Sequence, residues 1–196
     1  RTLERSLNRA KIPLARTQGF NPRPRMQFAS ALSLGYTSDQ ELADIWLMET
    51  LNPTETQATM MARMAPGLEI TAVSDIPLQS PPLQTITHAA RYEATPLDGG
   101  DADDLQRRVD ALVAAESVMR ERKRKKGRVR RYDLRPLIYD LSLDQTADAP
   151  TLHFLLALEE GKTGRPDELL MQLGFDPLDV RVDRAEIVVK GGVWQE

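Results

Sequence analysis

Apolar positions recur with helical and with alternating periods along the first half of the chain. Leu3, Leu7 and Ala10 fall on one helical face, and Pro13 limits that helix. Residues 41–49 carry apolar side chains on both faces, which is typical of a central strand. The pattern predicts these elements: a helix over 1–11, strands over 26–32 and 41–49, a helix from Asn52-Pro53 to about Met64, and a strand over 68–73.

The second half has a similar alternation of strand and helix patterns. Acidic residues at 101–104 favour a helix start, and Gly174 favours a helix end. The pattern predicts strands over 90–96, 152–158 and 180–189, helices over 101–115 and 165–173, a hairpin of 117–125 with 128–132, and a helix or strand over 137–143.

This order predicts an α+β fold of two ferredoxin-like (split βαβ) domains in tandem. The first, over residues 1–78, lacks its opening strand, and the second covers residues 86–191. A proline-rich linker at 75–84 joins them. Because the chain begins at Arg1 rather than Met, we expect a segment ahead of it.

Composition excludes several classes of protein. With 41% hydrophobic and 28% charged residues, the chain is a folded one, and no apolar run is long enough to span a membrane. The absence of cysteine excludes disulfides, thiolate metal sites and an iron–sulfur cluster held by this chain alone. We therefore expect a cytoplasmic protein that binds neither metal nor cofactor itself.

Charge is strongly segregated, although the net charge is only −3. Residues 1–25 hold seven Lys/Arg against Glu4, and residues 120–131 hold nine against Glu121. The remainder has 10 basic and 27 acidic residues. Two basic surfaces on an acidic body favour binding of a polyanion at those two places.

The first basic segment combines an Arg-bearing helix with the loop Gly19-Phe20-Asn21-Pro22-Arg23-Pro24-Arg25. Its arginines would hold phosphates and Phe20 would stack on a base. The alternative is a solvated helix face followed by a rigid turn, with Phe20 as a core plug. The candidate residues are Arg5, Arg9, Arg16, Phe20, Arg23 and Arg25.

The second basic segment is the predicted hairpin over 120–131, where alternation places positive charge on both faces. Contact with nucleic acid is one interpretation, and a solvated loop or a protein-partner patch is the other. The candidate residues are Arg122, Arg124, Lys126, Arg128 and Arg130. The following Tyr132-Asp133-Leu134-Arg135-Pro136 string is interpreted as structural, with Asp133 and Arg135 pairing or capping a turn.

No set of residues forms a convincing catalytic pattern. His88 has no obvious acidic partner in sequence, and His153, on an apolar strand, is interpreted as a core histidine. There is no phosphate-binding loop of Walker type and no dinucleotide fingerprint. We therefore predict no catalytic and no metal-binding residues.

Several strings resemble the radical-SAM-linked protein family over most of the chain. They are Leu7 to Pro13, Gln18 to Ala29, Leu34-Gly35, Ser38, Glu41, Asp44, Tyr132 to Pro136, and Arg165 to Leu170. The family often has His where this chain has Arg23, and its opening segment is absent here. The element order is also similar to the tandem ferredoxin-like RNA-processing proteins of CRISPR systems, by fold analogy alone.

The resemblance implies a domain of unknown function, fused or adjacent to a radical S-adenosylmethionine protein that holds the iron–sulfur cluster and S-adenosylmethionine. Together with the basic segments it predicts a non-catalytic accessory domain that binds RNA (tRNA or rRNA). The alternatives are a module that docks on the radical enzyme without RNA, and a metal-independent endoribonuclease using His88 or Tyr132.

Overall fold

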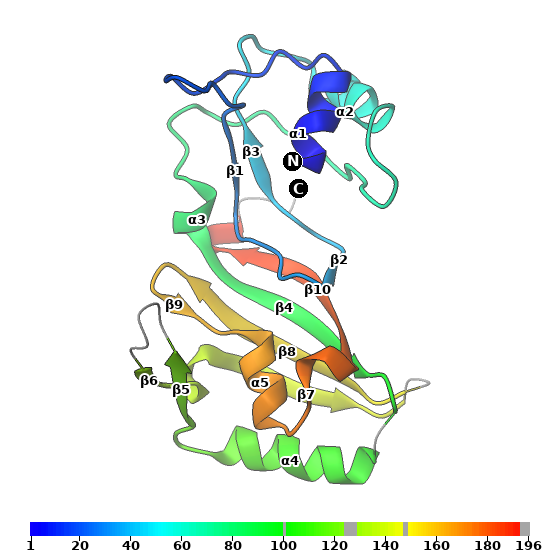
Figure 1. Cartoon of the computed structure of the whole chain (residues 1–196), viewed down its shortest axis with the longest axis vertical. Coiled ribbons are helices and arrows are strands. Elements are labelled where there is room, and N and C mark those ends of the chain that lie inside the picture. The colour runs from blue at the N-terminus through cyan, green and yellow to red at the C-terminus, as the bar shows by residue number, and fades with distance from the viewer. Residues whose placement is uncertain (100, 124–128, 147–148, 193–196) are drawn as a thin grey trace. The chain divides into compact units, whose positions relative to one another are not determined.

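The computed structural model describes residues 1–99, 101–123, 129–146 and 149–192 (Figure 1). This part of the chain is a mixed α+β structure with several sheets and five α-helices. It divides into two compact units, Arg1–Phe28 with Ala43–Pro82, and Ala29–Leu42 with Leu83–Glu196. The α+β class is confirmed, whereas the tandem ferredoxin-like arrangement is not.

The first unit contains two helices and a short sheet. The helices are α1 (Thr2–Arg9) and α2 (Pro53–Met61), and the antiparallel strands are β1 (Met26–Phe28) and β3 (Ala43–Ile45). Its core is built from Leu7, Ala10, Ile12, Leu14 and Met60. The two predicted helices are confirmed, and Asn52 caps α2 as expected, its Oδ1 accepting from the Glu55 N–H at 3.1 Å.

Residues 68–73, predicted to be a strand, form none. Side chains of α2 bind part of their backbone instead. Gln57 Nε2 donates to the carbonyls of Ile70 and Thr71 at 3.0 and 2.9 Å, and the Ile70 N–H donates to Met61 Sδ. At Ile70 and Thr71 these bonds take the place of bonds to a neighbouring strand.

Two other strand predictions are wrong in part. The predicted 26–32 strand is limited to β1, because residues 29–42 join the other unit. The predicted central strand at 41–49 is only β3, in a two-stranded sheet. Ile45 and Leu47 of this segment pack on the core, whereas Met48 is 74% exposed. The segment is therefore buried on one face and not on both.

The second unit is organised around a sheet with the order β2-β10-β4-β8-β7, in which β9 also pairs with β8. Only β2 runs parallel to its neighbour. Its members are β2 (Thr37–Ser38), β4 (Thr87–Pro96), β7 (Ile138–Asp144), β8 (Thr151–Glu159), β9 (Lys162–Thr163) and β10 (Val180–Val189). The predicted strands at 90–96, 152–158 and 180–189 are confirmed.

Helices α4 (Ala102–Ala114) and α5 (Pro166–Gln172) pack on one face of this sheet, and a short α3 (Leu83–Ile86) precedes β4. The core between helices and sheet includes Tyr92 and Phe154, whose rings stack at 5.4 Å. Both helices were predicted, and Asp101 accepts from the Asp103 and Asp104 N–H groups at the start of α4. Strands β5 (Met119–Lys123) and β6 (Val129–Asp133) form the predicted hairpin.

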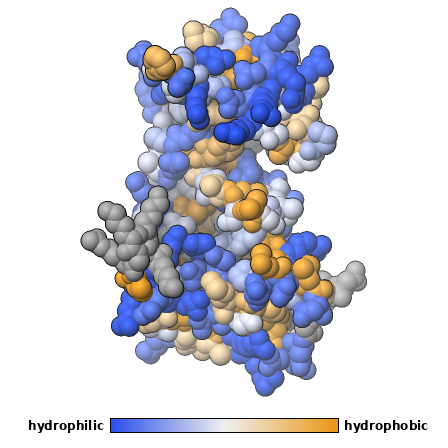
Figure 2. Space-filling model, viewed as in Figure 1, coloured by the Kyte–Doolittle hydropathy of each residue, from blue (hydrophilic) through white to orange (hydrophobic). Residues whose placement is uncertain are grey.

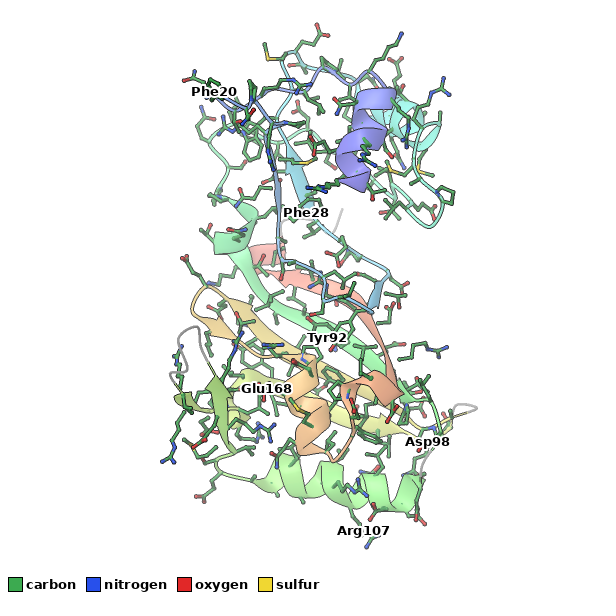
Figure 3. The ribbon with its side chains drawn as sticks, viewed as in Figure 1. Phe20, Phe28, Tyr92, Asp98, Arg107 and Glu168 are labelled. Atoms are coloured by element: carbon green, nitrogen blue, oxygen red, sulfur yellow. The ribbon has the colours of Figure 1, made fainter. Side chains whose placement is uncertain are left out.

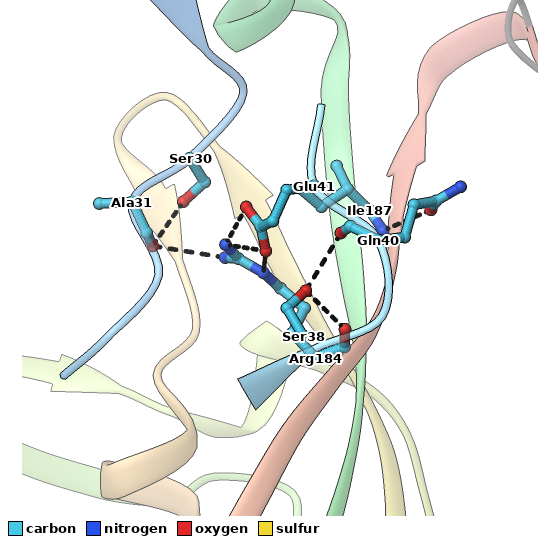
Figure 4. Close-up of polar contacts among 7 residues, drawn as sticks. All are labelled: Ser30, Ala31, Ser38, Gln40, Glu41, Arg184 and Ile187. Carbon is cyan, nitrogen blue, oxygen red and sulfur yellow. Dashed lines mark hydrogen bonds and ion pairs between the residues drawn. The ribbon is translucent and has the colours of Figure 1, made fainter. Parts of the chain in front are cut away.

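Residues 29–42 are fixed to the second unit by polar contacts at β10 (Figure 4). Arg184, buried in β10, donates from Nε and Nη2 to the two carboxylate oxygens of Glu41 at 2.8 and 2.7 Å. Ser38 Oγ donates to the Arg184 carbonyl at 2.9 Å, and Gln40 Oε1 accepts from the Ile187 N–H. These contacts stabilise the pairing of β2 with β10.

Candidate nucleic-acid interface

The loop at residues 14–25 is a narrow antiparallel ribbon. Arg16 is bridged to Pro24, and Leu14 to Leu47 beyond β3. The Thr17 N–H donates to the Arg23 carbonyl and the Arg25 N–H to the Ala15 carbonyl, both at 2.8 Å. Pro22 and Pro24 favour extended backbone at the residues before them, which explains why the sequence forms a ribbon here. We call residues 14–25 the Arg ribbon.

Phe20 lies at the tip of the Arg ribbon and is fully exposed. Figure 3 shows its ring at the outer end of the loop. The preceding Gly19 has a φ of +138°, which a residue with a side chain rarely adopts. The alternative that Phe20 packs into the core as a plug is therefore wrong, because its side chain is fully exposed.

The candidate arginines of this unit have different partners. Arg9 donates from Nη2 to Ser6 Oγ at 2.9 Å and to the Arg63 carbonyl at 3.1 Å. The Arg25 guanidinium lies 4.5 Å from the centroid of the Trp46 ring. Both side chains therefore help to hold the unit together. Arg5, Arg16 and Arg23 are exposed.

Arg16 and Arg23 lie on opposite sides of the Arg ribbon. Arg16 shares a side with Pro24, its bridge partner, and Arg23 and Arg25, two residues apart, share the other. Positive charge therefore lies on both sides of the ribbon behind Phe20. On the face shown in Figure 2, hydrophilic side chains cover most of the first unit.

The cations of residues 1–25 lack acidic partners. Within the described ranges, none of the seven Lys/Arg side chains in this segment forms an ion pair with a carboxylate. The second unit differs, because many of its arginines are paired. Those pairs are Arg91–Glu186, Arg107 and Arg108 with Asp104, Arg120–Glu168, Arg131–Glu121, Arg165–Asp167 and Arg184–Glu41.

The base of the β5–β6 hairpin is fixed to α5 through Glu168, which is 7% exposed. Arg120 Nε donates to Glu168 Oε2 at 3.3 Å, and Arg120 Nη1 donates to Gln172 Oε1 at 3.2 Å. Burial and the hydrogen bond to Glu168 raise the pKa of Tyr132, while Arg120 and Arg122 lower it. Glu168, labelled in Figure 3, is a contact that sequence spacing did not indicate.

The described part of the hairpin has unpaired charge on one face. Arg122 lies directly opposite Arg130, and Arg120 opposite Tyr132, so these four share a face. Arg122 and Arg130 are exposed and have no ion pair within the described ranges. We call Arg122 and Arg130 the arginine pair.

On the other face, Arg131 Nε donates to Glu121 Oε1 at 2.7 Å. Positive side chains therefore lie on both faces of the described hairpin, but Glu121 neutralises Arg131, so only the face of Arg122 and Arg130 has unpaired charge among the side chains described. Arg124, Lys126 and Arg128, three of the predicted site residues, lie outside the described residues.

The Tyr132-to-Pro136 string has the structural role predicted for it. Asp133 Oδ1 accepts from the Val118 N–H at 2.7 Å and from the Arg135 N–H at 3.0 Å. These hydrogen bonds lower the pKa of the Asp133 carboxyl. Arg135 donates to the carbonyls of Ile138 and Val113, both at 3.0 Å, and so joins β7 to the end of α4.

The structure changes the interpretation of both histidines. The His153 side chain is 37% exposed, 3.5 Å from Glu93, so the core assignment is wrong. It lies in β8 opposite Glu93 and Ser142, on the side of the strand away from Phe154. His88 does have an acidic partner, Glu159, at 2.9 Å. Sequence spacing did not show it because 71 residues separate the two.

Neither a metal site nor a membrane-spanning helix is found in the described part of the chain. No three or more His, Asp or Glu residues are grouped there so that they could hold a metal ion. No helix there is both long and apolar enough to cross a bilayer.

Comparison with known proteins gives a family and no described function. No curated protein matches the chain. A family model described as an uncharacterized protein conserved in bacteria (DUF2344) matches residues 1–166. That range covers the Arg ribbon, the β5–β6 hairpin and the strings through Pro166. The chain therefore belongs to the DUF2344 family of uncharacterized proteins conserved in bacteria.

Proposed function

We propose that this chain is a non-catalytic accessory domain that binds RNA through the Arg ribbon and the β5–β6 hairpin. The observation that carries the proposal is the lack of any described carboxylate partner for the cations of residues 1–25. Unpaired cations gathered on one segment gain most from a polyanion, whose binding releases condensed counterions.

Phe20 supports RNA, and single-stranded RNA in particular, as the ligand. A fully exposed aromatic ring between arginines offers a stacking surface for an unpaired base. The backbone hydrogen bonds of the Arg ribbon order the two arms on either side of Phe20 before binding, which lowers the backbone entropy lost on association.

The arginine pair supports a second contact on the hairpin. Like charges directly opposite each other destabilise a strand pair, so Arg122 and Arg130 repel one another in the unbound state. A phosphate between them would remove this repulsion, whereas Arg131 is already neutralised by Glu121.

We also propose a protein partner for this chain. A radical S-adenosylmethionine protein, fused or adjacent, would supply the iron–sulfur cluster, and this chain would present RNA to it. The lack of any cysteine makes this chain dependent on such a partner for a thiolate-held cluster. The rival proposal is that the same basic surfaces dock on that enzyme without RNA.

We also propose a ferredoxin-like fold for the second unit. Its element order, β4-α4-β7-β8-α5-β10, interrupted by the β5–β6 hairpin, and its strand order β10-β4-β8-β7 support this assignment. The order α1-β1-β3-α2 in the first unit supports an incomplete second copy.

The test is RNA binding by the whole chain across a salt series. In the variant Arg16→Gln/Arg23→Gln, two exposed phosphate ligands are lost, so the slope of log K against log salt should fall by about 1.4 for single-stranded RNA. The matched control Arg91→Gln/Arg107→Gln makes the same charge change at two ion-paired arginines and should leave that slope unchanged.

Phe20 gives a second test with the same RNA. Phe20→Ala should weaken binding of single-stranded RNA by about 1–3 kcal/mol and of duplex RNA by much less, while Phe20→Trp should retain it. If neither Phe20→Ala nor Arg16→Gln/Arg23→Gln changes RNA binding, or if the chain binds no RNA at low salt, the basic surfaces are assigned to protein docking instead.

A further inference from the structure

Five polar side chains, four from different strands and one directly after β10, gather at one end of the main sheet of the second unit. β4 and β7 begin at this end and β8 and β10 finish there, as their antiparallel pairing requires. The five residues are His88, Tyr139, Glu159, Lys162 and Lys190, of which only Glu159 and Lys162 are near one another in sequence. We call them the His88 cluster; it does not involve the Arg ribbon or the arginine pair.

The members of the His88 cluster are joined by direct contacts. Glu159 Oε1 accepts from His88 Nδ1 at 2.9 Å and from the Tyr139 hydroxyl at 3.3 Å. Lys162 Nζ donates to the Tyr139 hydroxyl at 3.0 Å, and Lys190 Nζ lies 3.2 Å from Glu159 Oε2. The His88 and Tyr139 rings stack, with centroids 5.2 Å apart.

Two β-bulges bring these rings together. The register of β4 with β10 shifts between Val188 and Val189, which leaves His88 unmatched. The register of β7 with β8 shifts between Ile138 and Asp140, which leaves Tyr139 unmatched. A bulge re-aims the side chain of the extra residue, and bulges are over-represented next to functional sites. Independent bulges on two strands therefore point both rings at Glu159.

The His88 cluster has more cationic donors than its one carboxylate can satisfy. Lys190 and His88 lower the pKa of Glu159, so this carboxylate is ionised and His88 Nδ1 must be the donor. His88 Nε2 then has no hydrogen-bond partner within the described ranges. Each lysine ammonium has three donors, of which Lys162 uses one on the Tyr139 hydroxyl, its Nζ also lying 5.1 Å from the Tyr139 ring centroid, and Lys190 uses one on Glu159. The two lysines outweigh Glu159 by one charge.

The cluster is open to solvent, since the side chains of His88 and Lys190 are 43% and 51% exposed. We propose that the His88 cluster is a binding site for a phosphate group. Lys162 and Lys190 supply the charge and the donors, His88 Nε2 accepts from a protonated oxygen of the phosphate, and Glu159 and Tyr139 hold these groups in position. Ammonium donors and an imidazole acceptor in one cluster match the acceptor oxygens and the hydroxyl of a phosphate group.

The experiment uses the two histidines of the full chain as reporters. Imidazole NMR signals are followed while inorganic phosphate is added at fixed pH, against sodium chloride of equal ionic strength, with a His153→Gln variant to assign the signals. A saturable shift of the His88 signals, with His153 unmoved, is the expected result. The double variant Lys162→Gln/Lys190→Gln should weaken phosphate binding at least tenfold. The control Lys11→Gln, in the first unit, should leave phosphate binding unchanged.

The phosphate group could belong to a nucleotide or RNA end, or be free phosphate, and a titration with adenosine monophosphate separates the two. If adenosine monophosphate binds more tightly than inorganic phosphate, the ligand is a nucleotide or an RNA end. If the two bind equally, the ligand is free phosphate. The proposal is overturned if the two histidines shift together, if neither shifts, or if the lysine double variant leaves the His88 response intact. Because RNA binding is measured separately, either proposal can fail without the other.

Discussion

At the scale of single residues, Arg184 is buried to 2% exposure, with Glu41 as its counter-ion. Removing one member of a buried ion pair leaves an uncompensated charge in the interior. Glu41→Ala should therefore lower the free energy of unfolding by about 3 kcal/mol in urea denaturation. The control Glu186→Ala, which removes the partner of Arg91, an arginine whose side chain is 45% exposed, should cost less than about 1 kcal/mol. Equal effects of the two variants would show that the burial of Arg184 gives its ion pair no special weight.

Asp133 gives a pH-dependent prediction. Hydrogen bonds from the Val118 and Arg135 N–H groups lower its pKa in the folded state. Its contribution to stability is therefore present above the unfolded pKa of about 3.9 and is lost as pH falls through the lower folded value. Asp133→Asn should destabilise the protein at pH 7, and the difference from wild type should shrink below about pH 4.

Urea denaturation at several pH values measures this difference. The control Asp98→Asn, at an exposed carboxyl labelled in Figure 3, should change the free energy of unfolding by less than about 0.5 kcal/mol at pH 7. A difference for Asp133→Asn that stays constant down to pH 3 would contradict the assigned cause.

Contacts between residues close in sequence could be predicted better than contacts between residues far apart in sequence. The Asn52 and Asp101 caps and the Asp133 turn depend on neighbours within three residues, or on a hairpin partner. The contacts of Glu41 with Arg184 and of His88 with Glu159 span 143 and 71 residues. No spacing rule reaches that far, so only the tertiary structure shows which arginines are neutralised.

At the scale of elements, periodicity predicted helices and long strands well and short strands poorly. Helix α4 and strands β4, β8 and β10 each bury apolar residues at regular spacing. Helix α2 buries only Thr56 and Met60, and its Asn52-Pro53 start predicted it better than its period did. The segment 68–73 has a strand pattern, but α2 side chains bind its backbone at Ile70 and Thr71 and it pairs with no described strand. An apolar alternation shows that a segment packs on a core, and it does not show what its backbone bonds to.

The β5–β6 hairpin predicts an asymmetry between its faces. Arg122→Gln/Arg130→Gln should weaken single-stranded RNA binding and lower the salt slope by about 1.4, because two unpaired phosphate ligands are removed. Arg131→Gln, on the opposite face, breaks an ion pair with Glu121 and should lower the slope by much less than half that amount. Filter binding across a salt series measures both, and equal slopes per arginine removed would contradict a one-sided contact.

At the scale of the whole molecule, the two basic surfaces belong to different units, the Arg ribbon to the first and the hairpin to the second. If both engage one RNA, the second contact is intramolecular and raises affinity by a factor of about 10²–10⁴. An RNA of about 6 nucleotides would occupy one surface, and one of about 30 nucleotides would be able to reach both.

The prediction is that the long RNA binds at least 100-fold more tightly than the short one. Neutralising either surface, with Arg16→Gln/Arg23→Gln or Arg122→Gln/Arg130→Gln, should bring the long RNA close to the affinity of the short one. A gain with length that merely follows the number of available binding positions, and that survives both double variants, would mean that the surfaces act separately.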